Sequence, residues 1–134
     1  MDAKELMLGD WVHHIDGYDL QIEAITDKGL VCCSGDFIGQ DCMIRPILLT
    51  PEILKKNGIF KHKFKGHLEE CYSAFANPIN NEQFILWEET DRFELVLRHI
   101  VDNLTYSALR CKVRYVYELQ HALRLCGIEK EIKL

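Results

Sequence analysis

Short runs of alternating apolar and polar residues fill the first fifty positions of the chain and end at turn-forming clusters. The runs are LMLGDWVHHI, DLQIEAIT and GLVCCS, and they are separated by Asp16-Gly17 and by Asp27-Lys28-Gly29. A period of two residues places successive side chains on opposite faces of a strand, and Asp-Gly pairs favour tight turns. The pattern predicts a small antiparallel meander or an SH3-like small β-barrel over residues 1–49.

The segment LLTPEILKKNGIF carries the clearest local signals for a helix. Thr50 is a favourable N-cap residue, Pro51 suits the first helical position, and Gly58 suits the position just beyond the last turn. Glu52 lies near the positive end of the helix dipole, where a carboxylate is favourable. We therefore expect a short helix that links the first group of strands to the second half of the chain.

Three more strand-like segments follow this helix: His67–Phe75, Glu82–Glu89 and Arg92–Ile100. Turn-forming residues lie between them, so they predict an antiparallel sheet. The stretch Leu104–Arg110 fits either a further strand or the approach to a helix. The last six residues, EKEIKL, are alternating and charged, which is typical of a strand at the edge of a sheet.

The hydrophobic period changes near the end of the chain. Four apolar residues recur at intervals of three and four positions: Val116, Leu119, Leu123 and Cys126. This spacing predicts a long amphipathic helix over Val113–Cys126 that packs on the sheet, and Gly127 would end it.

These elements predict an α+β fold in one compact domain over residues 1–134. Of the 134 residues, 48% are hydrophobic, so the chain can bury a core without metals or disulfides. Within this domain the order of elements suggests two lobes. The first is β-barrel-like and covers 1–49, and the second is a sheet with a helix and covers 50–134.

Charge and hydropathy indicate where such a protein works. The formal net charge of −5 opposes general binding to a phosphate backbone. The first residues lack the basic start and apolar run of a secretory signal, and no run approaches the roughly 20 apolar residues of a membrane-spanning helix. We expect a cytoplasmic protein with no membrane association, in which the six cysteines are free thiols.

Two groups of residues have the chemistry of metal ligands. Glu118 and His121 lie three positions apart, which is half of a carboxylate-bridged di-iron site, but no second pair accompanies them. Zinc-type ligands occur among the first strands, without the spacing of paired zinc ligands: Cys32, Cys33, Cys42, His13 and His14. No phosphate-binding loop or catalytic motif occurs. The sequence predicts no catalytic residue, no metal and no cofactor, and it argues against an enzyme.

One basic segment, KHKFKGH, contrasts with the acidic composition. In a strand, alternation would place Lys61, Lys63 and Lys65 on one face, where they could contact nucleic-acid phosphates. A second basic group follows in the later part of the chain: Arg110, Lys112 and Arg114. The other interpretation of the first group is a charged edge strand whose lysines prevent unwanted pairing.

Three further segments can be compared with known sequences: LMLGDWV, PILLTPEILKKNGIF and YVYELQ. Together they resemble a group of small uncharacterised proteins from gut Bacteroidales genomes and their phages and prophages. This chain departs from the group's pattern at Ile59, which is inserted before Phe60, and at Tyr117, where the group usually has His. The resemblance implies a bacterial or phage cytoplasmic setting and an accessory role, and it implies no activity, cofactor or catalytic residue.

The function that we expect from the sequence is that of a non-enzymatic module that binds a protein partner or a second copy of the chain. Aromatic residues usually anchor such surfaces, and the candidates are Trp11, Tyr18 and Trp87, which should then share one apolar patch. An accessory protein that binds nucleic acid through its Lys-rich strand is the alternative. A small enzyme without a recognisable motif is the third interpretation.

Overall fold

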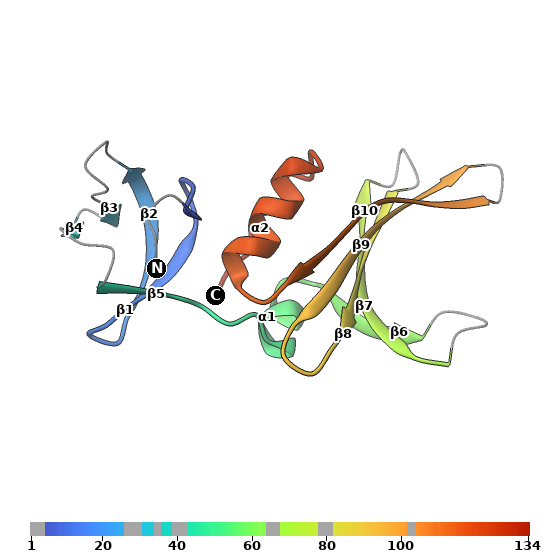
Figure 1. Cartoon of the computed structure of the whole chain (residues 1–134), viewed down its shortest axis with the longest axis horizontal. Coiled ribbons are helices and arrows are strands. Elements are labelled where there is room, and N and C mark those ends of the chain that lie inside the picture. Colours follow the sequence, from blue (N-terminus) through green and yellow to red (C-terminus); the bar gives the residue numbers. More distant parts are fainter. Residues whose placement is uncertain are drawn as a thin grey trace. The chain divides into compact units, whose positions relative to one another are not determined.

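The computed structural model describes residues 5–25, 31–33, 36–38, 43–63, 68–77, 82–101 and 104–134 (Figure 1). The fold is mixed α+β, with two antiparallel sheets and two helices. The chain divides into two compact units. Unit 1 comprises Met1–Leu48 and Tyr115–Ala122, and unit 2 comprises Leu49–Arg114 and Leu123–Leu134.

The sheet of unit 1 has the strand order β4-β3-β2-β1-β5. Its strands are β1 (Trp11–His14), β2 (Asp19–Ile25), β3 (Val31–Cys33), β4 (Asp36–Ile38) and β5 (Ile44–Pro46). The first four strands follow one another as an antiparallel meander, and β5 returns to pair with β1. Among the described residues β4 and β5 remain the outer strands. The sheet is therefore not a closed barrel.

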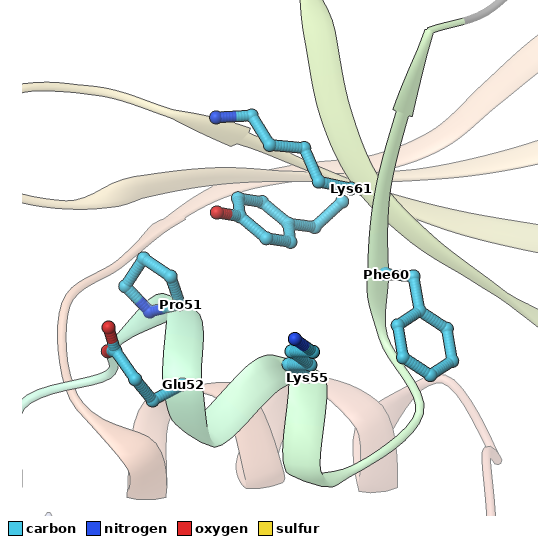
Figure 2. Close-up of a pocket in the computed structure, with 6 residues that line it drawn as sticks. Pro51, Glu52, Lys55, Phe60 and Lys61 are labelled. Carbon is cyan, nitrogen blue, oxygen red and sulfur yellow. The ribbon is translucent and has the colours of Figure 1, made fainter.

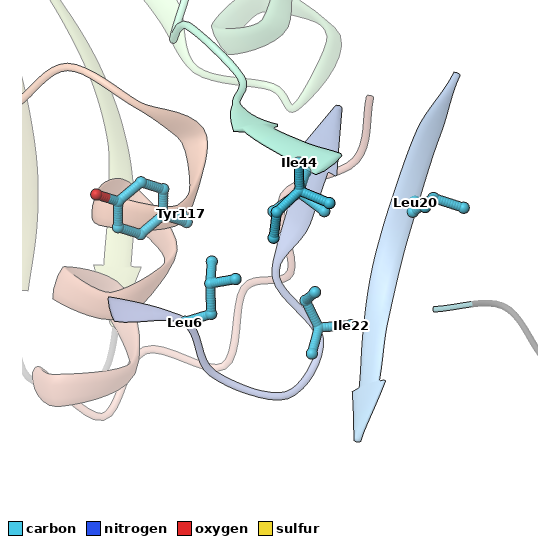
Figure 3. Close-up of a cluster of buried hydrophobic side chains, with 6 residues drawn as sticks. Leu6, Leu20, Ile22, Ile44 and Tyr117 are labelled. Atoms are coloured by element: carbon cyan, nitrogen blue, oxygen red, sulfur yellow. The ribbon is translucent and has the colours of Figure 1, made fainter. Parts of the chain in front are cut away.

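A cluster of buried side chains forms the core of unit 1 (Figure 3). Its members come from the N-terminal segment, three strands and the last helix: Leu6, Val12, Leu20, Ile22, Ile44 and Tyr117. Alternation explains the contribution of β1, because Val12 and His14 are buried while Trp11 and His13 are only half-buried. Val12 lies directly opposite Leu20 on β2, so both side chains point to the same face.

Helix α1 (Pro51–Lys56) begins where the sequence predicts. The Thr50 hydroxyl accepts a hydrogen bond from the backbone N–H of Ile53 at 3.3 Å, which satisfies one of the unpaired donors of the first turn. Leu54 is fully buried and anchors the helix in unit 2. Gly58 follows the C-cap with a φ of 75°, a left-handed conformation that favours glycine.

The sheet of unit 2 has the strand order β10-β9-β8-β7-β6. Its strands are β6 (Phe60–Lys63), β7 (Glu70–Asn77), β8 (Glu82–Glu88), β9 (Phe93–Val101) and β10 (Leu104–Val113). The three predicted strands of this half are thus confirmed, and the ambiguous stretch that begins at Leu104 is a strand. Phe93, Leu95 and Leu97 are buried as alternation predicts, but Val96 on the opposite face is buried as well. Glu94 and Arg98, which share that face with Val96, are half-buried.

Helix α2 (Val116–Leu125) is shorter than the predicted helix Val113–Cys126. Val113 instead ends β10, where it lies opposite Phe93. Three of the four predicted apolar positions are confirmed, because Val116, Leu119 and Leu123 are buried, whereas Cys126 lies beyond the helix and is half-buried. Gly127 has a φ of 71° and ends the helix, with its N–H donating to the Arg124 carbonyl at 3.0 Å.

The C-terminal segment is not the predicted edge strand. Residues 128–134 form no regular element, and Ile128 and Ile132 are buried. The Asn57 side chain holds the backbone of Lys133 at two points: its carbonyl oxygen accepts from Lys133 N–H at 2.8 Å, and its amide donates to the Lys133 carbonyl at 2.7 Å. Lys56 donates to the Leu134 carbonyl. Side-chain contacts therefore replace the expected strand pairing.

Candidate binding site

Strand β6 lies at the edge of its sheet, and all four of its residues are exposed. It pairs with β7 on its inner side, where Phe60 lies opposite Ser73 and Lys61 lies opposite Tyr72. Phe60 is 56% exposed, which is high for a phenylalanine. Edge strands carry backbone N–H and C=O groups that can pair with another chain. β6 therefore combines a backbone edge with an exposed aromatic ring.

A pocket of about 410 Å³ adjoins β6. It is lined by residues from α1, β6 and β7: Pro51, Glu52, Lys55, Phe60, Lys61 and Tyr72. Figure 2 shows the α1 residues of this lining, Pro51, Glu52 and Lys55, and the β6 residues, Phe60 and Lys61. The volume lies within the range of pockets that take small molecules. The lining combines three ring-bearing residues with three charged ones. It therefore suits a ligand in which an apolar side chain lies next to a polar one.

Two contacts hold the Lys61 side chain beside this pocket. Its ammonium lies 5.5 Å from the centroid of the Tyr72 ring and 3.5 Å from the Glu88 carboxylate. The Tyr72 hydroxyl donates to the same carboxylate at 3.5 Å. Burial, followed by the negative charge of Glu88, raises the pKa of Tyr72 above its ordinary value.

The other face of β6 brings together a histidine and a serine that the sequence did not suggest as a pair. His62 Nε2 lies 2.7 Å from the Ser73 hydroxyl, and the Gln83 amide donates to that hydroxyl at 3.5 Å. A serine beside an imidazole is the arrangement of an activated nucleophile. Ser73, however, exposes only 5% of its surface, which leaves little room for a substrate. Strand pairing would have predicted this contact only if the register of β6 on β7 had been known.

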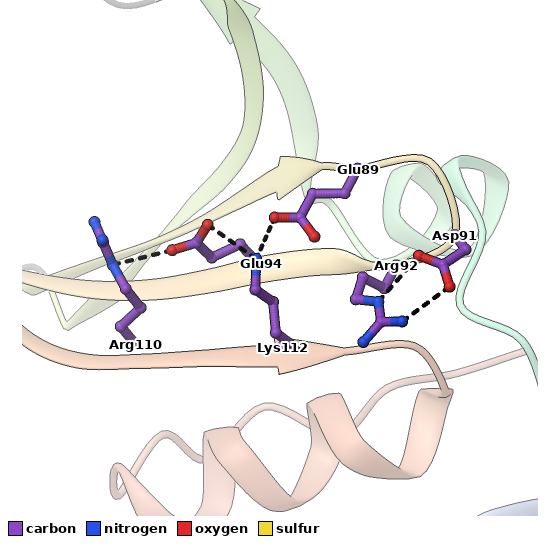
Figure 4. A network of polar contacts seen from close by, with 6 residues as sticks. All are labelled: Glu89, Asp91, Arg92, Glu94, Arg110 and Lys112. Atoms are coloured by element: carbon purple, nitrogen blue, oxygen red, sulfur yellow. Dashed lines mark hydrogen bonds and ion pairs between the residues drawn. The ribbon is translucent and has the colours of Figure 1, made fainter.

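The predicted basic groups differ in their surroundings. Lys61 and Lys63 are exposed on β6, whereas Lys65 lies outside the described residues. In the second group, Arg110 pairs with Glu94 at 3.0 Å, and Lys112 pairs with Glu89 and with Glu94 (Figure 4). The Arg110 and Lys112 charges are therefore offset by carboxylates on neighbouring strands or turns, which weakens the case for a phosphate-binding surface there. Arg114 is exposed and follows β10.

The predicted aromatic residues belong to different units. Trp11 lies on β1 and is half-buried, and Tyr18 lies in the turn before β2, exposed but stacked on the His14 ring at 4.7 Å. Both belong to unit 1. Trp87, on β8 of unit 2, is half-buried. Whether the three residues bind a partner stays a prediction.

Glu118 and His121 have separate structural partners in unit 1. The Glu118 carboxylate accepts from the backbone N–H of Tyr115 at 3.0 Å, at the start of α2. His121 Nε2 lies 2.6 Å from the carboxylate of Asp10, which also accepts from the Met7 N–H at 2.7 Å. His121 therefore does more than line the surface of α2, because its partner Asp10 has a fully buried side chain.

In the part of the chain that the structure describes, no three His, Cys, Asp or Glu side chains lie close enough together to hold a metal ion. The zinc hypothesis falls mostly outside this part, because nothing is described of the side chains of Cys32 and Cys33, and Cys42 is not described at all. Among the described residues, no helix is long and apolar enough to cross a membrane.

Comparisons with protein-family models, with curated proteins and with solved structures found no match to this chain.

Proposed function

We propose that this protein is a non-enzymatic interaction module that binds an extended segment of a partner protein along β6. The observation that carries the proposal is that an edge strand with four exposed residues adjoins a pocket lined by Pro51, Phe60 and Tyr72. An extended segment that adds to a sheet edge gains affinity from backbone hydrogen bonds and specificity from side-chain pockets. Phe60, which lines the pocket beside β6, can contact one apolar side chain of that segment.

Two further features agree with an adaptor-like role. The strand order β4-β3-β2-β1-β5 supports an SH3-like fold for unit 1, and by analogy such a fold often serves in protein binding. The resemblance to small phage and prophage proteins supports a cytoplasmic accessory role. Nucleic-acid binding is the weaker candidate, because the formal net charge is −5 and carboxylates pair with Arg110 and Lys112. Absence of DNA binding at about 50 mM salt would eliminate it.

The test starts from a displayed library of random peptides selected on the whole protein. Peptides that bind are then measured by fluorescence anisotropy, and their place on the protein is mapped by amide hydrogen exchange. We expect slower exchange in β6. Phe60→Ser should weaken binding by roughly 5- to 30-fold, the usual effect of losing an aromatic contact at an interface. Leu125→Ser, on α2, is the control, because Leu125 is also highly exposed and lies outside the pocket lining.

Two results would contradict the proposal. One is a library that yields no binder. The other is a set of binders that leave the β6 amides unprotected and bind the Phe60→Ser protein as tightly as the unmodified one.

A further inference from the structure

Lysines alternate with other residues along β6, which is an outer strand of its sheet among the described residues, and this alternation restricts what can pair with its outer side. Lys61 and Lys63 point to the same face as Tyr72 and Glu70, their direct neighbours on β7. Phe60 and His62 point to the opposite face. A strand added on the outer side would therefore meet two positive charges on one face and an aromatic ring on the other.

A second copy of this chain is a poor partner for that edge. In an antiparallel pair, two directly opposed residues either both point their N–H groups at the partner strand or both point them away from it. Outward-pointing N–H groups alternate along β6, so a two-fold pairing of β6 with β6 matches odd-numbered residues with odd-numbered ones. Every such register that pairs Lys61 or Lys63 within β6 places lysine opposite lysine. Like charges directly opposite one another are destabilising, and edge lysines are a common way to prevent self-pairing.

Two carboxylates near β6 lie on its inner side. Glu70 is opposite Lys63 on β7, and Glu88 on β8 is 3.5 Å from the Lys61 ammonium. Carboxylates on an added strand would lie on the outer side of the same two lysines and would extend a row of alternating charges across the sheet. This arrangement favours a partner segment that is acidic on the lysine-bearing face.

We propose, building on the proposed function, that the partner segment carries two acidic residues two positions apart, opposite Lys61 and Lys63, with an apolar residue next to one of them against Phe60. The chemistry that β6 recognises is thus an extended acidic peptide whose carboxylates and apolar residue point to opposite faces.

The probe is a blocked, fluorescein-labelled heptapeptide with glutamate at its third and fifth positions, isoleucine at its second and sixth, and threonine elsewhere. This arrangement serves strand addition in either direction. Its partner probe has glutamine in place of both glutamates. Two exposed ion pairs should make the glutamate peptide bind roughly 2- to 30-fold more tightly than the glutamine peptide at low salt.

Matched protein variants assign the preference to β6. The preference should disappear in the double variant Lys61→Gln/Lys63→Gln and persist in Arg110→Gln/Lys112→Gln, which removes two cations from the other edge strand, β10. Both probes should slow amide exchange in β6.

Separate results overturn this inference and the proposed function. Equal binding of both probes at β6, or a preference that survives in the Lys61→Gln/Lys63→Gln protein, overturns the acidic-partner inference and leaves strand addition standing. If neither probe binds, the inference fails, and the library selection decides the proposed function. Binding of the probes without protection of β6 contradicts both.

Discussion

His121→Ala should destabilise the protein because it removes the partner of a buried carboxylate. Asp10 has a fully buried side chain, and His121 Nε2 lies 2.6 Å from it. Leaving a buried acceptor without one of its partners costs about 1–3 kcal/mol, and the lost edge contact between the His121 and Tyr117 rings adds about 0.5 kcal/mol. The His121 side chain is 20% exposed, so water can partly replace the ring. We expect a loss of about 2 kcal/mol in the free energy of unfolding.

The chain offers a matched control for this substitution. His13 lies 2.7 Å from Asp19, almost the same distance, but these side chains are 43% and 44% exposed. His13→Ala should therefore cost only about 0–1 kcal/mol. Urea unfolding followed by tryptophan fluorescence gives both values, and a double-mutant cycle with Asp10→Ala isolates the coupling between Asp10 and His121. Equal losses for the two histidine variants would refute the argument that burial of the carboxylate sets the cost.

Two further predictions concern the core. Leu119→Ala should lower the free energy of unfolding by about 2–5 kcal/mol, because Leu119 is fully buried, whereas the exposed Leu125→Ala should change it by less than about 0.5 kcal/mol; equal losses in urea unfolding would contradict this. Burial, followed by the charge of Glu118, raises the pKa of Tyr117 from 10 to about 12. Since the raised value favours the protonated folded state, its contribution to stability is complete below pH 10 and is lost as the pH rises towards 12. Tyr117→Phe should flatten this part of the curve of urea midpoint against pH, and an unchanged slope would contradict the assignment.

Local signals predicted the elements that depend on neighbouring residues. The boundaries of α1 follow from Thr50, Pro51 and Gly58, all within nine positions of one another. The strands β8 and β9 follow from their patterns and the turns around them. The predicted start of α2 at Val113 was wrong because Val113 fits two patterns. It continues the two-residue alternation of β10, and it also precedes the apolar residues that recur every three or four positions in the helix. Only the pairing with Phe93 decides between them.

Contacts between distant residues were not predictable in this way. Asp10 and His121 are 111 positions apart, so nothing near His121 in the sequence indicates a buried carboxylate. The lysines of β6 were identified, together with the edge-strand interpretation, because alternation alone places them on one face. The adjoining pocket was missed because its lining comes from α1, β6 and β7. The alternation of the last residues suggested a strand, whereas Ile128 and Ile132 serve as anchors for an irregular segment.

The two hydrogen bonds between the Asn57 side chain and the Lys133 backbone have a consequence for the order of folding. Asn57 is the C-cap residue of α1, and its side-chain amide donates to Ile53 in that helix and to Lys133, which lies 76 positions further along the chain. A ribosome delivers α1 long before it delivers Lys133, so the helix end first forms without this partner. Contacts of such sequence separation are slow to form because a long loop must close first. The C-terminal segment should therefore dock late, and a nascent chain that stops before Lys133 should have a less stable α1 than the finished one.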